Sequence, residues 1–462
     1  MEFISTRGKT AGLGFIDAVL MGLADDGGLL VPKAIPQVSA DTLSKWQQLA
    51  YPELALEIIS LYVDGEIPQD ELKALIDSSY STFRSKEVTP IRKIKKDLYV
   101  LELFHGPTFA FKDIALQFLG NLYSYISRTN NSIIHILGAT SGDTGASAIE
   151  GVRGKEGIKI CILHPEGKVS KVQELQMTTV DDRNVLNLAV DGNFDDCQRI
   201  IKELFADVSF KNEYHLRAIN SINFARILAQ TVYYFYAYFE LVNQGVTGPI
   251  NFSVPTGNFG DIFAGYLAKK MGLPAGKLIL ATNENNILER FVNDGVYQPG
   301  EFHMTYSPSM DIQVASNFER YLYYLLGEDG AAVSARMESF RTEGRITVEG
   351  ELLSRVQQDF AAASVENDDC LATIGQVHDD EGYLLDPHTA CGVAAAQQLE
   401  LKGGATVALA TAHPAKFNEA IELIQIEQTF PPQIQALFDK PQHQKQVSGS
   451  NEAVKTELLK FF

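Results

Sequence analysis

The sequence predicts an α/β protein built on parallel sheets flanked by helices, with a mostly helical domain at the N-terminus. Two patterns support this fold class. After residue 95, short runs rich in β-branched residues alternate with amphipathic stretches, which is typical of parallel strands joined by helices. Before that point the alternation is missing, and the first hundred residues are polar-rich with helical spacing. The length of 462 residues is enough for about two to four domains.

The N-terminal region, residues 1–94, is expected to form a mainly helical domain of its own. One helix is expected to begin at Ser39 or Asp41 and another at Pro68, because small polar residues and proline are common at helix starts. A turn at residues 25–28 leads into a short apolar run at 29–31.

The strands expected after residue 95 are short apolar runs bounded by turn residues. They lie at 98–104, 133–137, 158–163, 185–190, 250–254, 278–281 and 406–410, and helices are expected at 195–205 and 224–241. We expect an α/β domain at 95–245, with a mobile subdomain at about 133–205, and a second α/β domain at 246–462. The polar tail after Pro431 is expected to pack loosely or cap the surface. In such sheets, ligands bind beyond the carboxyl ends of the strands.

Composition and charge exclude several classes of protein. The chain is 45% hydrophobic and 21% charged, which is typical of a globular protein with a substantial core. Its net charge of −19 argues against nucleic-acid binding, which needs a basic surface. No stretch is long and apolar enough to span a membrane, and the N-terminus does not resemble a signal peptide. The four cysteines lack metal-ligand spacing, so we expect reduced thiols, no metal site and a cytoplasmic protein.

A lysine among aromatic and apolar residues is the first candidate for chemistry. Lys112 follows an expected strand, opens an expected helix and stands next to Phe111. Burial disfavours the ammonium form, so such an amine is available as a nucleophile, and lysines that form Schiff bases need this environment. The alternative is a surface lysine at a helix start, paired with Asp113.

Two glycine-containing loops, each between an expected strand and an expected helix, are candidate anion sites. The first occupies residues 138–145 and includes Ser141 and Asp143, and the second occupies 257–260. Backbone N–H groups at a helix N-terminus bind anions, and glycine permits close approach. The lysine of the P-loop pattern is missing, so nucleotide binding fits poorly. The alternative for the first loop is an ordinary turn capped by Asp143 or Ser141.

Two further segments contribute polar groups. Asn220, Ser221 and Arg226 stand near an expected helix start, where a guanidinium fork and amides recognise phosphate. The alternative is a capped helix with a solvated arginine. Thr411 follows the last expected strand, where its hydroxyl can offer one neutral hydrogen bond to a ring nitrogen. The alternative is that Thr411 caps the next helix.

Together these segments resemble the threonine synthase family of pyridoxal-phosphate enzymes, in its longer bacterial and fungal branch. The resemblance extends over nearly the whole chain and follows the order of the family's motifs. The matching segments are residues 5–8, 22–29, 105–113, 140–145, 257–260, 386–392 and 411–417. The resemblance implies the fold of the tryptophan synthase β chain (fold type II), pyridoxal 5'-phosphate as cofactor and O-phospho-L-homoserine as substrate. The longer branch is commonly monomeric, which favours a monomer.

The resemblance also implies a role for each candidate residue. Lys112 would hold the cofactor as a Schiff base, Thr411 would face its pyridine nitrogen, and Asp143 would stand where cysteine synthase-like relatives carry asparagine near its 3′-oxygen. The cofactor phosphate would lie on Gly257, Asn258, Phe259 and Gly260. The substrate would be held by Ser141 and Thr144, and its phosphate by Asn220, Ser221 and Arg226.

The implied reaction converts O-phospho-L-homoserine and water to L-threonine and phosphate, the last step of threonine biosynthesis. Lys112, displaced from the cofactor by the substrate, would carry out the proton transfers that expel the γ-phosphate before water adds at the β carbon. One alternative is a threonine deaminase or a cysteine synthase-like β-replacement enzyme, and neither needs a second anion site for a γ-phosphate. The other is an inactive binding protein on the same scaffold.

Overall fold

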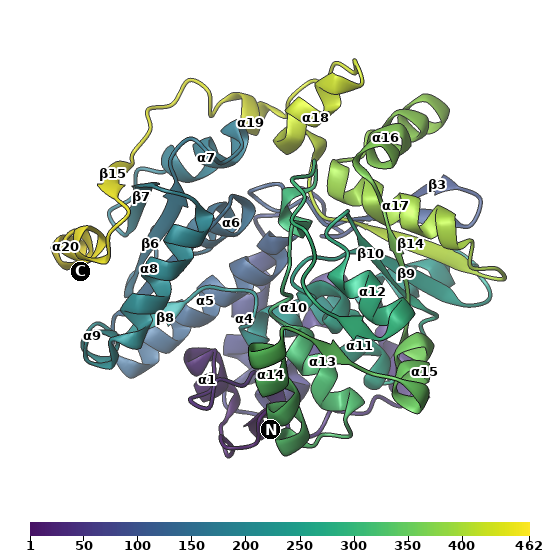
Figure 1. The fold of residues 1–462 in the computed structure, drawn as a ribbon, viewed down its shortest axis with the longest axis horizontal. Coiled ribbons are helices and arrows are strands. Elements are labelled where there is room, and N and C mark those ends of the chain that lie inside the picture. The colour runs from purple at the N-terminus through teal and green to yellow at the C-terminus, as the bar shows by residue number, and fades with distance from the viewer.

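The computed structural model describes residues 1–462, which form helices packed around two main sheets (Figure 1). Its N-terminal elements are β1 (Phe3–Ser5), α1 (Phe15–Met21), β2 (Leu30–Pro32), α2 (Ala40–Trp46), α3 (Tyr51–Val63) and α4 (Gln69–Tyr80). β1 pairs antiparallel with β2. Ser39 caps α2 by accepting a hydrogen bond from the N–H of Thr42, and Pro68 directly precedes α4. The expected helix starts are therefore confirmed.

The larger sheet has six strands in the order β13-β10-β9-β14-β4-β3. The strands are β3 (Ile91–Lys95), β4 (Leu98–Glu102), β9 (Ile250–Pro255), β10 (Leu278–Thr282), β13 (Phe360–Ser364) and β14 (Ala405–Ala410). All neighbours run parallel except β3, which pairs antiparallel with β4. The central strands β9 and β14 are buried along their whole length, as continuous apolar runs require. Helices α11 (Gly260–Lys270) and α17 (Pro387–Leu399) pack against this sheet.

The smaller sheet has five parallel strands in the order β15-β7-β6-β5-β8. The strands are β5 (Ile134–Ala139), β6 (Ile158–Pro165), β7 (Val185–Asp191), β8 (Leu216–Ala218) and β15 (Lys445–Ser448). Its helices are α6 (Asp143–Val152), α7 (Lys171–Thr178), α8 (Phe194–Ala206), α9 (Val208–Glu213) and α20 (Asn451–Phe461). Figure 1 shows this unit beside the larger sheet, with the C-terminus on its outer edge.

Two long helices connect the sheet units. α5 (Lys112–Asn130) packs against α6 and against α10 (Phe224–Asn243), and α10 also packs against α3 and α11. α5 and α6 approach closely because glycines face each other, and a Cβ atom on Gly120 would lie 2.1 Å from the carbonyl oxygen of Gly151. One cluster of 92 buried hydrophobic residues contains side chains from the N-terminal helices and from both sheets, so the three regions share a core.

The remaining elements lie mostly around the larger sheet. They are α12 (Ile287–Asp294), α13 (Phe318–Leu325), α14 (Gly330–Glu343), α15 (Gly350–Asp359), α16 (Asn367–Glu381), α18 (Asn418–Leu423), α19 (Pro432–Gln435), β11 (Val296–Tyr297), β12 (Ile346–Thr347), η1 (Pro308–Met310) and η2 (Pro414–Phe417).

The structure contains every strand and helix expected after residue 95, so the α/β class with a helical N-terminal region is confirmed. The expected domain boundaries stay a prediction. Two strands pair with strands from the other side of the expected boundary at residue 245. β4 belongs to the 95–245 segment but pairs with β14, and β15 belongs to the 246–462 segment but pairs with β7. The C-terminal tail is also more ordered than expected, since α20 buries Val454 and Leu458 against the smaller sheet unit.

Candidate active site

Strand ends from both sheets meet in one region between the two sheet units. Lys112 begins α5 after the loop that follows β4, and Thr411 directly follows β14. The loop after β5 leads into α6, and the loop after β9 leads into α11. Short contacts join these segments, with the Lys112 Nζ atom 3.3 Å from Asp143 Oδ2 and the Phe111 N–H donating to the Thr411 carbonyl at 2.8 Å. The carboxyl ends of parallel strands are where such folds bind ligands.

Lys112 is not a surface lysine. Only 12% of its side chain is exposed, and its Nζ atom lies 4.9 Å from the centre of the Phe111 ring. Asp113 does not pair with it, because both carboxylate oxygens of Asp113 accept hydrogen bonds from Thr108, at 2.8 Å from the N–H and 2.6 Å from the hydroxyl. The amine of Lys112 is therefore held at the site rather than at the surface.

Asp143 lies between two lysines. Its Oδ2 atom faces Lys112, and its Oδ1 atom is 2.8 Å from Lys416 Nζ and accepts from Gln173 Nε2 at 2.7 Å. Burial by itself raises the pKa of Asp143, but the two ammonium groups outweigh burial and hold that pKa far below its usual range. Asp143 does not cap α6, whose N-cap residue is Gly142 with no side-chain bond. The turn is capped instead by Thr140, whose Oγ1 atom accepts from the N–H groups of Gly142 at 3.0 Å and Gly145 at 2.9 Å, so capping does not account for the carboxylate of Asp143.

Burial is the largest influence on the Lys112 amine and lowers its pKa. The positive charges of Lys416 and Arg226 lower that pKa further, and the carboxylate of Asp143 opposes them. A depressed amine pKa is what a nucleophilic lysine requires at neutral pH.

Lys416 is a candidate functional residue that the sequence did not single out. It lies in η2 after β14, and its side chain is 0% exposed. Its ammonium group contacts Asp143 and donates to the Thr108 carbonyl at 2.8 Å. Its position in the segment 411–417 was the only signal available. Burial and pairing, which set it apart from other lysines, arise only in the fold.

The loop after β9 forms a cradle of free backbone donors. None of the N–H groups of residues 258–261 donates a hydrogen bond within the chain, and they lie at the N-terminus of α11. Phe259 precedes the helix with a left-handed φ of 64°. A Cβ atom on Gly257 would lie 2.5 Å from the Ser309 carbonyl oxygen, so glycine is required there. Free N–H groups at a helix start bind phosphate.

Arg226 is a buried cation without a partner. It is 4% exposed, and its Nε and Nη1 atoms are buried with no hydrogen-bond partner. Burial lowers the pKa of Arg226 to about 10, so the guanidinium stays charged at neutral pH. The helix α10 is capped by Asn223, whose side chain accepts from the N–H of Ala225 at 3.0 Å. The alternative interpretation was a capped helix with a solvated arginine. The cap is present, but Arg226 is buried rather than solvated.

Ser221 is linked to the cradle through two residues that the sequence analysis missed. The Ser316 hydroxyl lies 2.8 Å from the Ser221 hydroxyl and donates to Asn258 Oδ1 at 3.1 Å. The Asn317 amide donates to the carbonyls of Ser221 at 3.2 Å and Asn258 at 3.1 Å. These bonds hold the segment before α10 beside the loop after β9. No local motif signals Ser316 and Asn317, because they lie far along the chain.

The other expected site residues are placed around this centre with free polar groups. Ser141 and Asn220 are exposed, and Thr144 is half-buried in the first turn of α6. Thr411 is buried, and no hydrogen bond within the chain uses its hydroxyl. It does not cap η2, because that element is capped by His413.

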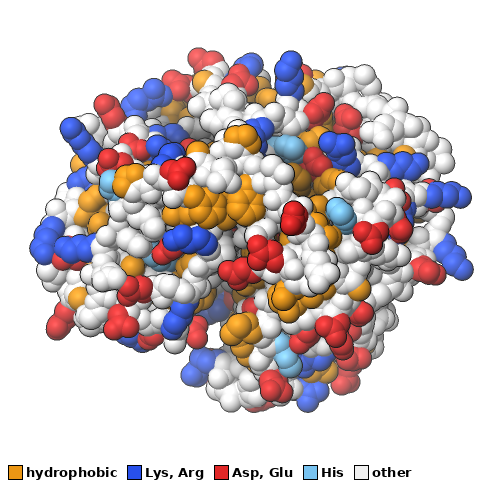
Figure 2. Space-filling view, turned by 90° about the horizontal axis from the view of Figure 1, so that it is seen from above, with side chains coloured by type: hydrophobic (Ala, Val, Ile, Leu, Met, Phe, Trp, Pro, Cys, Tyr) orange, Lys and Arg blue, Asp and Glu red, His pale blue; other side chains and the backbone are white.

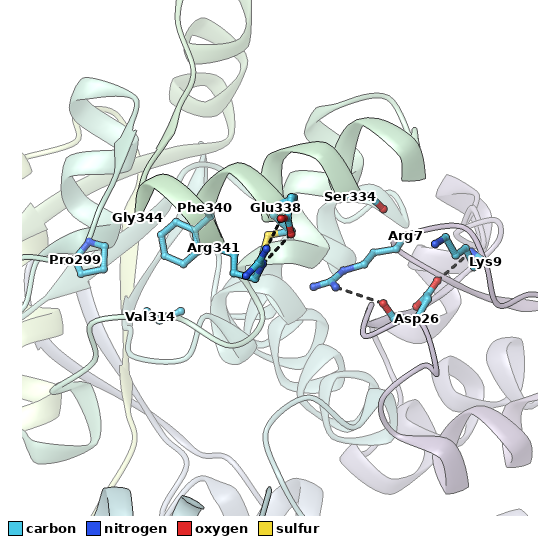
Figure 3. Close-up of a pocket in the computed structure, with 11 residues that line it drawn as sticks. Arg7, Lys9, Asp26, Pro299, Val314, Ser334, Glu338, Phe340, Arg341 and Gly344 are labelled. Carbon is cyan, nitrogen blue, oxygen red and sulfur yellow. Dashed lines mark hydrogen bonds and ion pairs between the residues drawn. The ribbon is translucent and has the colours of Figure 1, made fainter. Parts of the chain in front are cut away.

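A separate cavity lies away from these residues. It has a volume of about 750 Å³ and is lined by residues of the N-terminal turn and of α14 (Figure 3). Arg7 and Lys9 contact Asp26 on one side, and Arg341 pairs with Glu338 on the other. None of the expected site residues lines this cavity.

Surface charge, helix composition and the placing of possible metal ligands can be compared with what nucleic-acid-binding, membrane-spanning and metal-binding proteins need. Acidic and basic side chains are mixed on the face in Figure 2 and form no continuous basic surface there. No helix is long and apolar enough to cross a membrane. No group of three or more His, Cys, Asp or Glu side chains converges as a metal site, and all four cysteines are free and buried.

The donor set fits pyridoxal phosphate. The free N–H groups at α11 match its phosphate, the unused Thr411 hydroxyl suits its ring nitrogen, and the buried Lys112 amine suits its aldehyde. Residues 83–412 match the family described as "Pyridoxal-phosphate dependent enzyme". The fold and the site thus define a pyridoxal-phosphate-dependent enzyme.

The segments on either side of this match, and relatives that match nearly the whole chain, identify the family within this class of enzyme. Residues 2–80 match "Threonine synthase N terminus" and residues 389–457 match "Threonine synthase, C-terminal". Threonine synthase of Schizosaccharomyces pombe is 46% identical, covering 92% of this chain and 89% of its own, and that of Pseudomonas aeruginosa is 45% identical, covering 95% and 94%. The crystal structure of PLP-bound threonine synthase from Brucella melitensis is 42% identical with a TM-score of 0.96, covering 100% and 99%. The chain belongs to the threonine synthase family.

Proposed function

We propose that this chain converts O-phospho-L-homoserine and water to L-threonine and phosphate, with Lys112 as the lysine that binds the cofactor covalently. One observation supports this proposal above the others. The site contains two separate places for an anion, the free N–H groups at α11 and the unpartnered guanidinium of Arg226. The N–H groups at α11 suit the phosphate of the cofactor, and the guanidinium of Arg226 suits the phosphate of a phosphorylated substrate. The substrates of a threonine deaminase or a β-replacement enzyme carry no γ-phosphate, so such an enzyme needs no site for one.

The charges around the site favour a substrate with negative groups. Lys112, Lys416 and Arg226 are buried or nearly so, and Asp143 is the carboxylate that contacts both lysines. Arg226 is the cation that Asp143 does not contact, and because a buried charge needs a partner, a phosphate bound beside Arg226 would balance it.

We assign the cofactor to Lys112, Asp143, Thr411 and the loop of Gly257, Asn258, Phe259 and Gly260. We assign the substrate to Ser141 and Thr144 and its phosphate to Asn220, Ser221 and Arg226. The network of Ser316 and Asn317 supports the last group, because it holds Ser221 next to the cofactor-phosphate loop.

When bound, pyridoxal phosphate supplies an electron sink for the carbon–hydrogen bonds of the substrate. Lys112 is the base of the site, because its low pKa leaves the Nζ atom able to take and return protons at neutral pH. Thr411 offers a neutral hydroxyl and places no charge beside the ring nitrogen. Arg226 orients the leaving phosphate through its guanidinium fork.

Water exclusion completes the proposed cycle. We propose that residues 133–205, within the smaller sheet unit, move onto the bound substrate and protect reactive species from stray water. The Asp143 contacts with Lys112 and Lys416 join this unit to the larger one, which supports a closing surface at the site. Small-angle scattering with and without a substrate phosphonate measures such closure, and identical profiles would contradict it.

The decisive test of the reaction measures two products in one vessel. Purified protein with pyridoxal phosphate should release phosphate from O-phospho-L-homoserine and form threonine in equal amounts. Serine, threonine and O-acetylserine serve as the alternative substrates. Turnover of these in preference to phosphohomoserine would support the deaminase or β-replacement alternative, and no turnover would support a binding protein. We also propose a cytoplasmic monomer, which light scattering after gel filtration checks for the assembly state.

A further inference from the structure

The carboxylate of Asp143 is shared by two lysines that are held differently. Lys416 Nζ lies 2.8 Å from Oδ1, and Lys112 Nζ lies 3.3 Å from Oδ2. Lys416 has a second acceptor, the Thr108 carbonyl at 2.8 Å, and its side chain is 0% exposed. Lys112 has only the one polar contact and is 12% exposed.

We propose that Lys416 is a positioning residue of the reaction: it is the permanent counter-ion of Asp143 and thereby leaves the Lys112 amine free to lose its proton. This inference rests on the proposed function, in which Lys112 is the lysine that binds the cofactor. It concerns Lys416, to which neither the family resemblance nor the site assignment gives a role.

The hydrogen bonds decide which lysine keeps its charge. An ammonium group is favoured by every acceptor that it contacts, and charge-assisted bonds at short distance are the strong ones. Lys416 makes two such bonds, whereas Lys112 makes one longer contact. Deprotonation of Lys416 would weaken both bonds and leave Asp143 poorly compensated. Deprotonation of Lys112 leaves the Asp143–Lys416 pair intact.

The charges that face Lys112 act in both directions. Asp143 at the start of α6 favours its ammonium form, and Asp261 at the start of α11 acts in the same sense. Lys416 in η2 and Arg226 in α10 favour its neutral form, as does burial, which is the largest influence on its pKa. Lys416 is the cation that also contacts Asp143, so it offsets the carboxylate beside Lys112.

The surroundings fix Lys416 in this place. The Lys416 carbonyl accepts from the Ser170 hydroxyl at 3.3 Å, and Ser170 caps α7. Three residues further along, Gln173 donates to Asp143 Oδ1. Both partners of the ion pair are therefore tied to the start of α7, so the pair is held in one geometry rather than sampling several.

A double-mutant cycle tests the inference, since opposite charges must give opposite shifts. The variants are Lys416→Met, Asp143→Asn and the double variant, with Lys416→Arg retaining the charge. Lys171→Met is the matched control, because Lys171 pairs with Glu174 at 3.2 Å on the surface of α7. The measurement is the pH midpoint at which the absorbance of the bound cofactor changes, which reports the proton on the Lys112 nitrogen. A second measurement is the rate at which Lys112 of the cofactor-free full chain is acetylated across pH, read by peptide mass.

Lys416→Met should raise both midpoints by about one pH unit or more, which means about tenfold less neutral amine at a given pH. Asp143→Asn should lower them, because it removes the charge that favours the ammonium form. The double variant should return close to the unmodified protein, and Lys416→Arg and Lys171→Met should move the midpoints little. A merely structural role for Lys416 does not produce shifts of opposite sign that cancel.

An unchanged or lowered midpoint in Lys416→Met would overturn the inference, and so would a double variant that stays shifted. If Lys416→Met fails to fold, comparison of the double variant with Asp143→Asn still decides, because removal of the Lys416 charge should raise the lowered midpoint of Asp143→Asn back toward that of the unmodified protein. Borohydride trapping of the cofactor separates this inference from the proposed function. An adduct on another lysine would refute the proposed function, whereas an adduct on Lys112 with no midpoint shift would refute only the role of Lys416.

Discussion

Replacement of Arg226 by methionine should make the substrate-free protein more stable against unfolding. It should also raise the KM of the enzyme for its substrate. The Arg226 Nε and Nη1 atoms are buried without acceptors, and an unmet buried donor costs about 1–3 kcal/mol. Methionine keeps most of the side-chain stem and removes both donors and the charge. The free energy of unfolding without ligand should therefore rise by about 1–3 kcal/mol.

The same substitution should weaken the binding of the substrate. Loss of a charge-assisted contact to phosphate costs about 1.5–3 kcal/mol, or about a ten- to hundredfold rise in KM for O-phospho-L-homoserine. Cofactor affinity should change little, because the free N–H groups of the loop after β9 do not depend on Arg226. With pyridoxal phosphate bound, so that the loop after β9 is occupied, added inorganic phosphate should raise the melting temperature of the unmodified protein and not that of the variant, since a ligand stabilises only the state that binds it.

Urea unfolding, steady-state kinetics and thermal melting with phosphate check these three effects. Arg199→Met is a suitable control, because Arg199 lies at the surface of α8 and pairs there with Glu203 at 3.1 Å. It should leave KM and the phosphate effect unchanged. A stability that falls in Arg226→Met together with an unchanged KM would refute the reasoning, because it would mean that Arg226 has a structural role and no ligand.

The remaining predictions concern the cofactor and one buried acid. Borohydride reduction followed by peptide mass mapping should place the pyridoxyl group on Lys112, and an adduct elsewhere would remove the site assignment. Thr411→Val should lower cofactor affinity by roughly 0.5–1.5 kcal/mol, and nitrogen-15 NMR of labelled cofactor should find the ring nitrogen unprotonated in the unmodified enzyme. A protonated nitrogen would contradict the role of Thr411. Burial raises the pKa of Asp261 from 3.8 to about 6, despite hydrogen bonds from two tyrosines. The stability that comes from this proton is complete below pH 3.8 and is lost as the pH rises through about 6, roughly 3 kcal/mol in all. Asp261→Asn should abolish that dependence, and parallel pH curves in urea unfolding would show that the acid does not titrate in this way.

The loops that carry the candidate site residues could be predicted from local sequence because each follows a buried parallel strand. A strand covered on both faces needs an unbroken apolar run, as in β9 and β14, and such runs are visible in the chain. The polar residues directly after them lie at strand ends, so Thr411 and the loop at 257–260 could be proposed as site residues without a structure. Lys112 was singled out because its neighbours are aromatic and apolar, and the structure shows that its side chain is only 12% exposed.

Pairings between distant segments were decided only by the tertiary structure. The strand β15 joins the smaller sheet next to β7, and β4 joins β14, because edge and neighbour positions depend on long-range hydrogen bonding that leaves no local pattern. The sequence left open whether Asp143 lies at the cofactor or caps a helix, and in the fold its carboxylate contacts two lysines. Lys416 lies in the segment 411–417, but nothing in the sequence set this lysine apart. Its function arises from burial opposite a carboxylate 273 residues earlier in the chain, and that encounter exists only when both sheet units are packed together.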